Sequence, residues 1–193
     1  MSIPFGRVLT AMITPFDVEG AVDVQAVWDL ARHLVDEGSD GVVVAGTTGE
    51  SPTLSADEKV MLFRTVVEAV GDRAVVVAGT GTYDTAESVH LTKLATATGV
   101  HGVMAVTPYY SRPPQQGLFE HFTAIADASS VPVLIYNIPS RTGRLIEVST
   151  LATLAAHPRI AAVKDAVGDL AFTTKTMQLC GGSLAIYSGD DIL

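Results

Sequence analysis

A lysine stands at the end of an apolar run in the segment "RIAAVKDAVGD", residues 159–169. The four residues Ile160–Val163 are all apolar, and Lys164 follows them directly. A charged side chain in such a position needs either a partner or a chemical role. An apolar site lowers the pKa of a lysine from about 10.4, and this frees the amine to attack carbonyl groups. The alternative is a structural lysine that is ion-paired with a neighbour such as Asp165.

A tyrosine and an arginine follow another apolar run, in "LIYNIPSRTG" at residues 134–143. If the two runs are adjacent parallel strands, Tyr136 and Lys164 lie side by side. The phenol can then transfer protons while a carbinolamine forms and loses water; otherwise Tyr136 is a core residue with a hydrogen-bond partner. The planar guanidinium of Arg141 suits a substrate carboxylate, although a surface or subunit-contact arginine is the alternative.

The loop "AGTTGES" at residues 45–51 is a candidate anion site. Its two glycines allow a tight turn, and the consecutive N–H groups with the hydroxyls of Thr47 and Thr48 can converge on a carboxylate. An ordinary connection between a strand and a helix would have the same pattern.

Seven short runs rich in β-branched residues supply the elements that would position these side chains. The runs cover residues 7–13, 41–46, 74–79, 102–108, 131–139, 160–166 and 184–190. They are almost wholly apolar, which is typical of parallel strands covered on both faces. Helical patterns lie between them: residues 22–37 carry one apolar stripe, and Ser55–Glu58 and Asp84–Glu87 are candidate capping boxes. The Pro-rich stretch 107–117 is predicted to be a stiff loop.

Strands that alternate with helices fit either an open doubly wound sheet or a barrel. No G-x-G-x-x-G follows the first run, and the polar residues gather after several different runs, as they do at the C-terminal face of a barrel. We therefore predict an α/β fold, a (β/α)8 TIM barrel. Such a barrel needs eight strands and about 250 residues. We interpret this 193-residue sequence as one domain, residues 1–193, truncated after the seventh strand; an open seven-stranded variant is the alternative.

Composition excludes several classes of function. The net charge is −9 and basic residues are scattered, which argues against a nucleic-acid partner. No apolar run approaches the roughly 20 residues of a membrane span, and no secretory signal is apparent, so we expect no membrane partner. A single cysteine, Cys180, fits a cytoplasmic location. The five histidines form no metal-binding motif, so no metal is expected.

Seven motifs in order resemble those of the pyruvate-dependent Schiff-base lyase and aldolase family. They are "TAMITPFD", "GTTGES", "GTGTYDTAE", "TPYYSRPPQQG", "YNIPSRTG", "VKDAVGD" and "SGDD". The resemblance covers the whole sequence. It implies a (β/α)8 barrel followed by a small helical domain, so that residues 1–193 would lack the eighth βα unit and the C-terminal helices. It also implies a homo-oligomer, a tight dimer and commonly a dimer of dimers, that needs no cofactor.

The resemblance further implies roles for individual residues. Lys164 would form an imine with pyruvate. Tyr136, Thr47 and Tyr110 would relay protons, with Tyr110 contributed across the dimer interface.

Substrate binding would fall to other residues of the same motifs. Thr47, Thr48 and Gly189 would bind pyruvate, and Arg141 the carboxylate of a second substrate. The sequence is most similar to family members that condense pyruvate with L-aspartate 4-semialdehyde in the diaminopimelate route of lysine biosynthesis. Arg141 argues against the sialic-acid lyases of the family. The alternatives are a sibling enzyme of the N-acetylneuraminate lyase or 2-keto-3-deoxy-gluconate aldolase type, or an inactive fragment.

Some family members are inhibited by lysine, which binds at the dimer interface. Three residues match that effector site: Ser51, Glu87 and Tyr109. Three others depart from it: Ala56, Lys59 and Tyr83. An ammonium group at position 59 would repel a cationic effector, so we expect weak or absent feedback by lysine.

Overall fold

All seven apolar runs form strands of one parallel sheet in the computed structural model, which describes residues 3–190 and 192. The strands are β1 (Leu9–Ala11), β2 (Gly41–Val44), β3 (Val75–Gly79), β4 (Gly102–Val106), β5 (Val133–Asn137), β6 (Ile160–Asp165) and β7 (Ala185–Ser188). Each strand pairs with the next one along the chain, in the order β1-β2-β3-β4-β5-β6-β7. A doubly wound sheet would reverse its order at a switch point. The predicted barrel order is therefore confirmed for these seven units.

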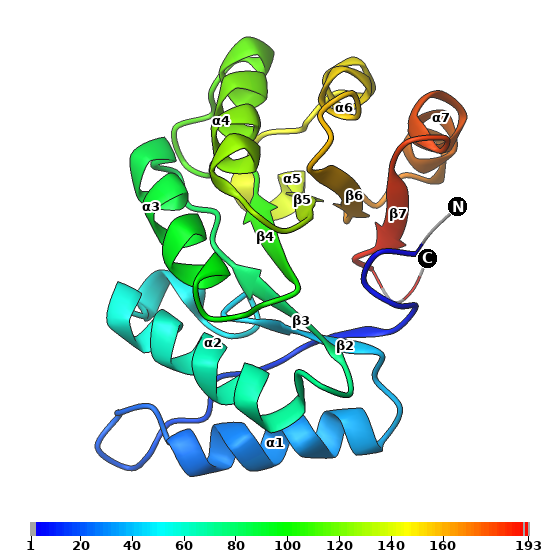
Figure 1. Ribbon diagram of the computed structural model, residues 1–193. Coiled ribbons are helices and arrows are strands. Elements are labelled where there is room, and N and C mark those ends of the chain that lie inside the picture. Colours follow the sequence, from blue (N-terminus) through cyan, green and yellow to red (C-terminus); the bar gives the residue numbers. More distant parts are fainter. Residues whose placement is uncertain (1–2, 191, 193) are drawn as a thin grey trace.

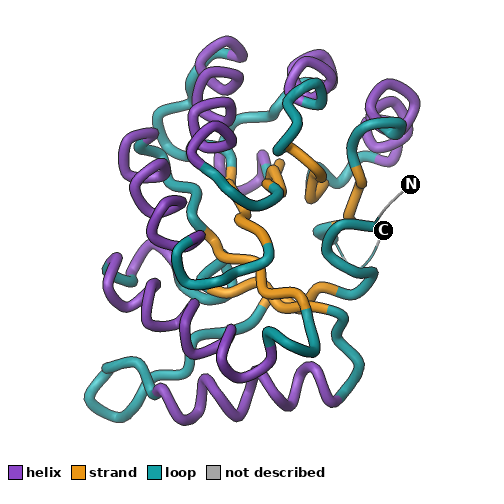
Figure 2. Tube along the Cα trace, viewed as in Figure 1, coloured by secondary structure: helices purple, strands orange, loops and turns teal. Residues whose placement is uncertain are grey.

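Helices connect successive strands, and the long ones lie outside the curved sheet (Figures 1 and 2). These outer helices are α1 (Val24–Asp36), α2 (Ala56–Val70), α3 (Thr85–Thr96), α4 (Gln115–Ala128), α6 (Val148–Leu154) and α7 (Leu170–Cys180). The single turn α5 (Pro139–Thr142) and the short 3-10 helix η1 (Ser51–Thr53) lie instead in the loops that follow β5 and β2. The C-terminal ends of all seven strands consequently meet at one face of the sheet.

Local capping fixes where the helices begin. Ser55 and Glu58 form the predicted capping box of α2, and the Asp84 carboxylate accepts the N–H groups of Ala86 and Glu87 at the start of α3. The helix predicted over 22–37 begins two residues later, because the Asp23 side chain accepts the N–H of Ala26 and acts as the N-cap.

The loop predicted over residues 107–117 is shorter than expected. Helix α4 already begins at Gln115, directly after Pro114. Proline suits a helix start because its φ is preset and the first N–H groups of a helix need no intrahelical partner. The first turn of α4 therefore carries the two glutamines that the sequence pattern assigned to the loop.

The sheet is apolar on both faces because it separates two cores. The larger core lies between the sheet and the helices and includes Phe63, Phe122 and Ile146. The smaller one fills the concave side and includes Phe5, Met104 and Tyr136. The strands therefore lack the alternation of a half-exposed sheet.

The last strand contacts the N-terminal segment, which bends around the concave side (Figure 1). The Tyr187 hydroxyl accepts the N–H of Phe5 at 3.1 Å and donates to the carbonyl of Gly6 at 3.0 Å. These two hydrogen bonds join β7 to the segment before β1. Within residues 3–190, no helix combines the length and the apolar character that a membrane crossing requires.

Candidate active site

The register of the sheet brings the predicted lysine and tyrosine together. Tyr136 of β5 is paired with Lys164 of β6, and Lys164 is paired in turn with Tyr187 of β7. The Lys164 Nζ atom lies 4.3 Å from the centre of the Tyr136 ring. Lys164 is half-buried, so its amine sits at the boundary between the inner core and the open end of the sheet.

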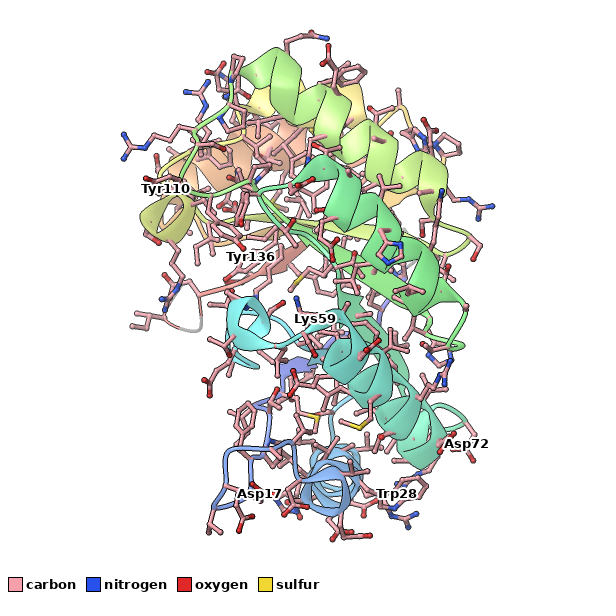
Figure 3. The ribbon with its side chains drawn as sticks, turned by 90° about the vertical axis from the view of Figure 1, so that its left-hand side faces the viewer. Asp17, Trp28, Lys59, Asp72, Tyr110 and Tyr136 are labelled. Atoms are coloured by element: carbon pink, nitrogen blue, oxygen red, sulfur yellow. The ribbon has the colours of Figure 1, made fainter. Side chains whose placement is uncertain are left out.

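The Tyr136 phenol is buried and is influenced by two further residues of the predicted set. Tyr136 lies inside the molecule (Figure 3). Only 5% of it is exposed, and this burial raises the pKa of its phenol. The positive charge of Arg141 and a hydrogen bond with the Thr47 side chain act in the opposite direction on that pKa. Tyr136 therefore links the lysine on β6 with the loops that follow β2 and β5, and it stays protonated at neutral pH.

The backbone of Gly189 lies directly beside the Lys164 side chain. Its N–H donates to the Asp165 carbonyl at 2.7 Å. A Cβ atom at position 189 would lie 2.8 Å from Cε of Lys164 and 3.0 Å from Cβ of Ala166. Any side chain there would have to displace the lysine, so glycine leaves the space that the lysine occupies.

A cavity of about 220 Å³ opens at the C-terminal ends of the strands. Thr47, Ser51, Tyr109 and Arg141 contribute to its polar lining, and Met104 lies on its apolar side. Such a volume suits a small organic acid with a few fixed polar contacts.

Two loops around this cavity contain residues in strained backbone conformations. Four non-glycine residues of the described chain have positive φ: Ala45 and Glu50 in the loop after β2, and Tyr110 and Arg112 in the loop after β4. Each left-handed conformation costs of order 1 kcal/mol for such residues, and conformations of this kind cluster at functional sites. The Thr14 hydroxyl, which donates to the Gly49 carbonyl at 2.7 Å, helps to hold the first of these loops.

The described chain brings some of the predicted residues together and leaves two apart. Lys164, Tyr136, Thr47, Arg141 and Gly189 are linked by the contacts above. Thr47 and Thr48 are both exposed, but within the described residues the Thr48 side chain makes no hydrogen bond to the others. Tyr110 lies at the outer edge of the molecule (Figure 3) and is 94% exposed. Tyr110 therefore does not reach the lysine from within its own chain.

The residues predicted from the effector site extend from the cavity to α2 and α3, because Ser51 and Tyr109 line the cavity while Lys59 lies in α2 and Glu87 in α3. Lys59 is only 7% exposed, and burial lowers the pKa of its ammonium while the negative charge of Glu87 acts to raise it. The rings of Tyr83 and Tyr109 meet edge to face at 5.3 Å. Lys59 and Glu87 therefore interact electrostatically between α2 and α3.

Two polar residues near the site, Asn137 and Gln115, were not singled out from the sequence, and Asp165 was considered only as an ion-pair partner of Lys164. Asn137 and Asp165 follow Tyr136 and Lys164 directly, and Gln115 begins α4. Asp165 accepts hydrogen bonds from the Val167 N–H and, at 2.7 Å, from the Thr173 hydroxyl. A polar residue directly after an apolar run is a signal, but its partners are not readable from the pattern.

A parallel barrel with a lysine and a tyrosine paired at the C-terminal ends of adjacent strands is the arrangement expected of the Schiff-base lyase and aldolase class. The family model of the dihydrodipicolinate synthetase family matches residues 4–193. The chain therefore belongs to this family.

Individual relatives agree with this assignment. The chain is 57% identical over 190 residues to 4-hydroxy-tetrahydrodipicolinate synthase 2 of Streptomyces coelicolor, covering 98% of this chain and 63% of the relative. The crystal structure of dihydrodipicolinate synthase DapA-2 of Bacillus anthracis superposes with a TM-score of 0.95 at 46% identity, over 97% of this chain and 64% of the other. A pyruvate complex of the Acinetobacter baumannii enzyme gives 0.94 at 36% identity, over 97% and 64%. The chain thus spans somewhat less than two thirds of these relatives.

Proposed function

We propose that this protein acts as a 4-hydroxy-tetrahydrodipicolinate synthase, which condenses pyruvate with L-aspartate 4-semialdehyde in the diaminopimelate route of lysine biosynthesis. The observation that carries the proposal is the placement of Lys164 against Tyr136, with Thr47 and Arg141 linked to the same phenol. The names of the similar proteins and the pyruvate complex of the Acinetobacter enzyme support the choice of substrates.

The reaction begins with attack of the Lys164 amine on the keto carbon of pyruvate. Tyr136, which burial keeps protonated, delivers a proton to the departing oxygen, and water leaves as the imine forms. Thr47, hydrogen-bonded to the phenol, passes the proton back. The pyruvate carboxylate is held by Thr47 and Thr48, and Gly189 leaves the space beside Lys164 in which pyruvate binds.

The second stage joins the two substrates. The imine loses a proton from its methyl carbon and becomes an enamine, whose carbon attacks the aldehyde of the second substrate. The aldehyde oxygen takes up a proton and becomes the hydroxyl group of the product. The substrate amine then attacks the imine carbon, closes the ring and releases Lys164 as the free amine.

Arg141 binds the carboxylate of L-aspartate 4-semialdehyde in this proposal. It lines the cavity on the side of α5, and its charge is felt by the Tyr136 phenol. A planar guanidinium binds a carboxylate through two parallel hydrogen bonds, which fixes the orientation as well as the position of the aldehyde.

Tyr110 completes the proton relay from the partner subunit of a tight dimer in this proposal, and a dimer of dimers is the expected assembly. Its 94% exposure and its φ of +69° support this role, because a strained backbone that presents an aromatic ring to solvent needs a compensating contact. If so, Tyr110→Phe slows turnover without changing the fold of the subunit.

Trapping of the imine tests the proposal in the protein expressed from its complete gene. Borohydride added with pyruvate should leave a reduced adduct on the peptide that contains Lys164. A peptide map in which this lysine is unmodified contradicts the mechanism. Turnover with pyruvate and L-aspartate 4-semialdehyde, compared with cleavage of sialic acid or 2-keto-3-deoxy-gluconate, distinguishes the synthase from its siblings.

A further inference from the structure

The chain between α5 and α6, residues 144–147, has no regular secondary structure and belongs to no sheet. Four consecutive backbone groups of this segment are nevertheless hydrogen-bonded, and all four partners are side-chain amides. They are the carbonyl of Leu145, the N–H and the carbonyl of Ile146, and the N–H of Glu147. Two residues, Asn137 and Gln115, thus take the place of a neighbouring strand.

Asn137 makes the inner half of this arrangement. Its Nδ2 atom donates to the Ile146 carbonyl at 3.1 Å, and its Oδ1 atom accepts the Ile146 N–H at 3.1 Å. Asn137 and Ile146 are both fully buried. The pair closes the loop from residue 137 to residue 146, which contains Arg141, directly onto the end of β5.

Gln115 makes the outer half from a different element. At the start of α4, its Nε2 atom donates to the Leu145 carbonyl at 2.8 Å. Its Oε1 atom accepts the Glu147 N–H at 3.1 Å and the Thr150 hydroxyl at 2.7 Å. Gln115 therefore ties the segment that follows Arg141 to the helix that follows the Tyr110 loop.

The turn between these anchors is also fixed. Arg141 lies in α5, a single turn whose N–H groups at Arg141 and Thr142 both point to the Ile138 carbonyl. Gly143 ends it at a φ of +71°, and the buried Thr142 hydroxyl lies 3.0 Å from the carbonyls of both Ile138 and Arg144. The backbone of Arg141 is thus held on both sides, while its side chain remains exposed at the cavity.

We infer that Asn137 and Gln115 are positioning residues that fix the Arg141 loop and thereby set the affinity for the carboxylate of the second substrate. The inference rests on the proposed function and deepens it. A bidentate contact between guanidinium and carboxylate is sensitive to small displacements, because both hydrogen bonds must align at once. The imine at Lys164 depends on β5 and β6, so loosening the segment at its outer anchor should leave imine formation intact.

The experiment compares two adjacent glutamines in the protein expressed from its complete gene. Gln115→Ala should raise the KM for L-aspartate 4-semialdehyde roughly tenfold, because three hydrogen bonds to the segment are lost. The KM for pyruvate and the extent of borohydride trapping should stay within about twofold. Gln116→Ala is the matched control: that side chain is exposed and bonds only to Glu120 among the described residues, so its removal should change neither KM.

A conservative variant and a double-mutant cycle separate positioning from general loss of structure. Gln115→Glu keeps the acceptor for Glu147 and Thr150 and should restore part of the affinity. In an Arg141→Ala background, Gln115→Ala should add little to the KM for the aldehyde, because the group that it positions is gone. Additive effects in the double variant, or an equal rise of both KM values in Gln115→Ala, would overturn the inference. Failure of the unmodified protein to trap pyruvate would instead overturn the proposed function beneath it.

Discussion

The strand ends and the loops of this site are built in different ways. Tyr136 and Lys164 lie on β5 and β6, where the register of the sheet pairs them, and Tyr136 also belongs to the inner core. Thr47 and Tyr110 lie on loops, and Arg141 lies on the single turn α5 between two loops; these connections rely on strained residues, threonine hydroxyls and side-chain amides. The difference suggests a division of work in which the sheet holds the group that becomes covalent and the loops select what reacts with it.

Replacing Lys164 should give the largest effect. Lys164→Met removes the nucleophile, so we expect a loss of turnover of about 10³-fold or more and no borohydride adduct. Lys175→Met, an exposed lysine on α7, is the control and should leave turnover unchanged. Full turnover by Lys164→Met would show that the residue at the end of β6 is not the nucleophile.

Tyr136 and Tyr187 are paired with Lys164 from the two neighbouring strands, and we expect their replacement to affect different properties of the protein. Tyr136→Phe should slow imine formation by about 10²-fold, measured by rapid mixing with pyruvate, because the proton donor is lost. Tyr187→Phe removes the two hydrogen bonds to Phe5 and Gly6 and should lower the free energy of unfolding by about 1–3 kcal/mol. If Tyr187→Phe slowed imine formation as much as Tyr136→Phe, Tyr187 would have a catalytic role and not only a structural one.

Replacing Arg141 tests the loop side of the comparison. Arg141→Ala should raise the KM for L-aspartate 4-semialdehyde by roughly 30-fold, as expected for a lost charge-assisted contact, while pyruvate trapping proceeds normally. Arg159→Ala, an exposed arginine just before β6, is a control at the opposite end of the strand. A defect in trapping by Arg141→Ala would show that the loop also serves the first half of the reaction.

The stability of the helix layer should fall in acid because of a buried histidine. His121 of α4 is 3% exposed, its Nδ1 atom lies 2.8 Å from the Thr85 hydroxyl of α3, and its Nε2 atom is buried without a hydrogen-bond partner among the described residues. Burial lowers the pKa of His121 from 6.5 to about 4, against the weaker effect of Asp84.

The folded state therefore favours the neutral imidazole of His121. Its contribution to stability is present above pH 6.5 and is lost as the pH falls toward 4, because the unfolded state takes up the proton first. The loss should reach roughly 2–3 kcal/mol by urea unfolding. His121→Gln should flatten this part of the pH profile, whereas His90→Gln, at an exposed position on α3, should not.

Much of the strand-end geometry could be predicted from the sequence. The apolar runs identify parallel strands, and adjacent parallel strands place Tyr136 beside Lys164 without knowledge of any loop. Helix starts were predicted within two residues at α1, and the capping box of α2 was predicted correctly. These features depend on short-range patterns of burial and capping.

The loop geometry was much less predictable. Gln115 was assigned to a loop, yet it lies in α4 and bonds to groups 30 to 35 residues away. Asn137 bonds nine residues ahead, across a turn whose shape depends on Gly143. Contacts of this kind follow from the packing of α4 against the α6 region, which no local pattern encodes. The partner of Tyr110 lies beyond the chain altogether in our proposal.

The close approach at position 189 has a consequence for protein engineering. One added methyl group would overlap Cε of Lys164 and would also lie close to Cβ of Ala166, so Gly189→Ala should aim the amine differently and require a small adjustment around Ala166. Substitutions at residue 189 should therefore change the position of the nucleophile, and with it the reaction rate, more than they change the melting temperature.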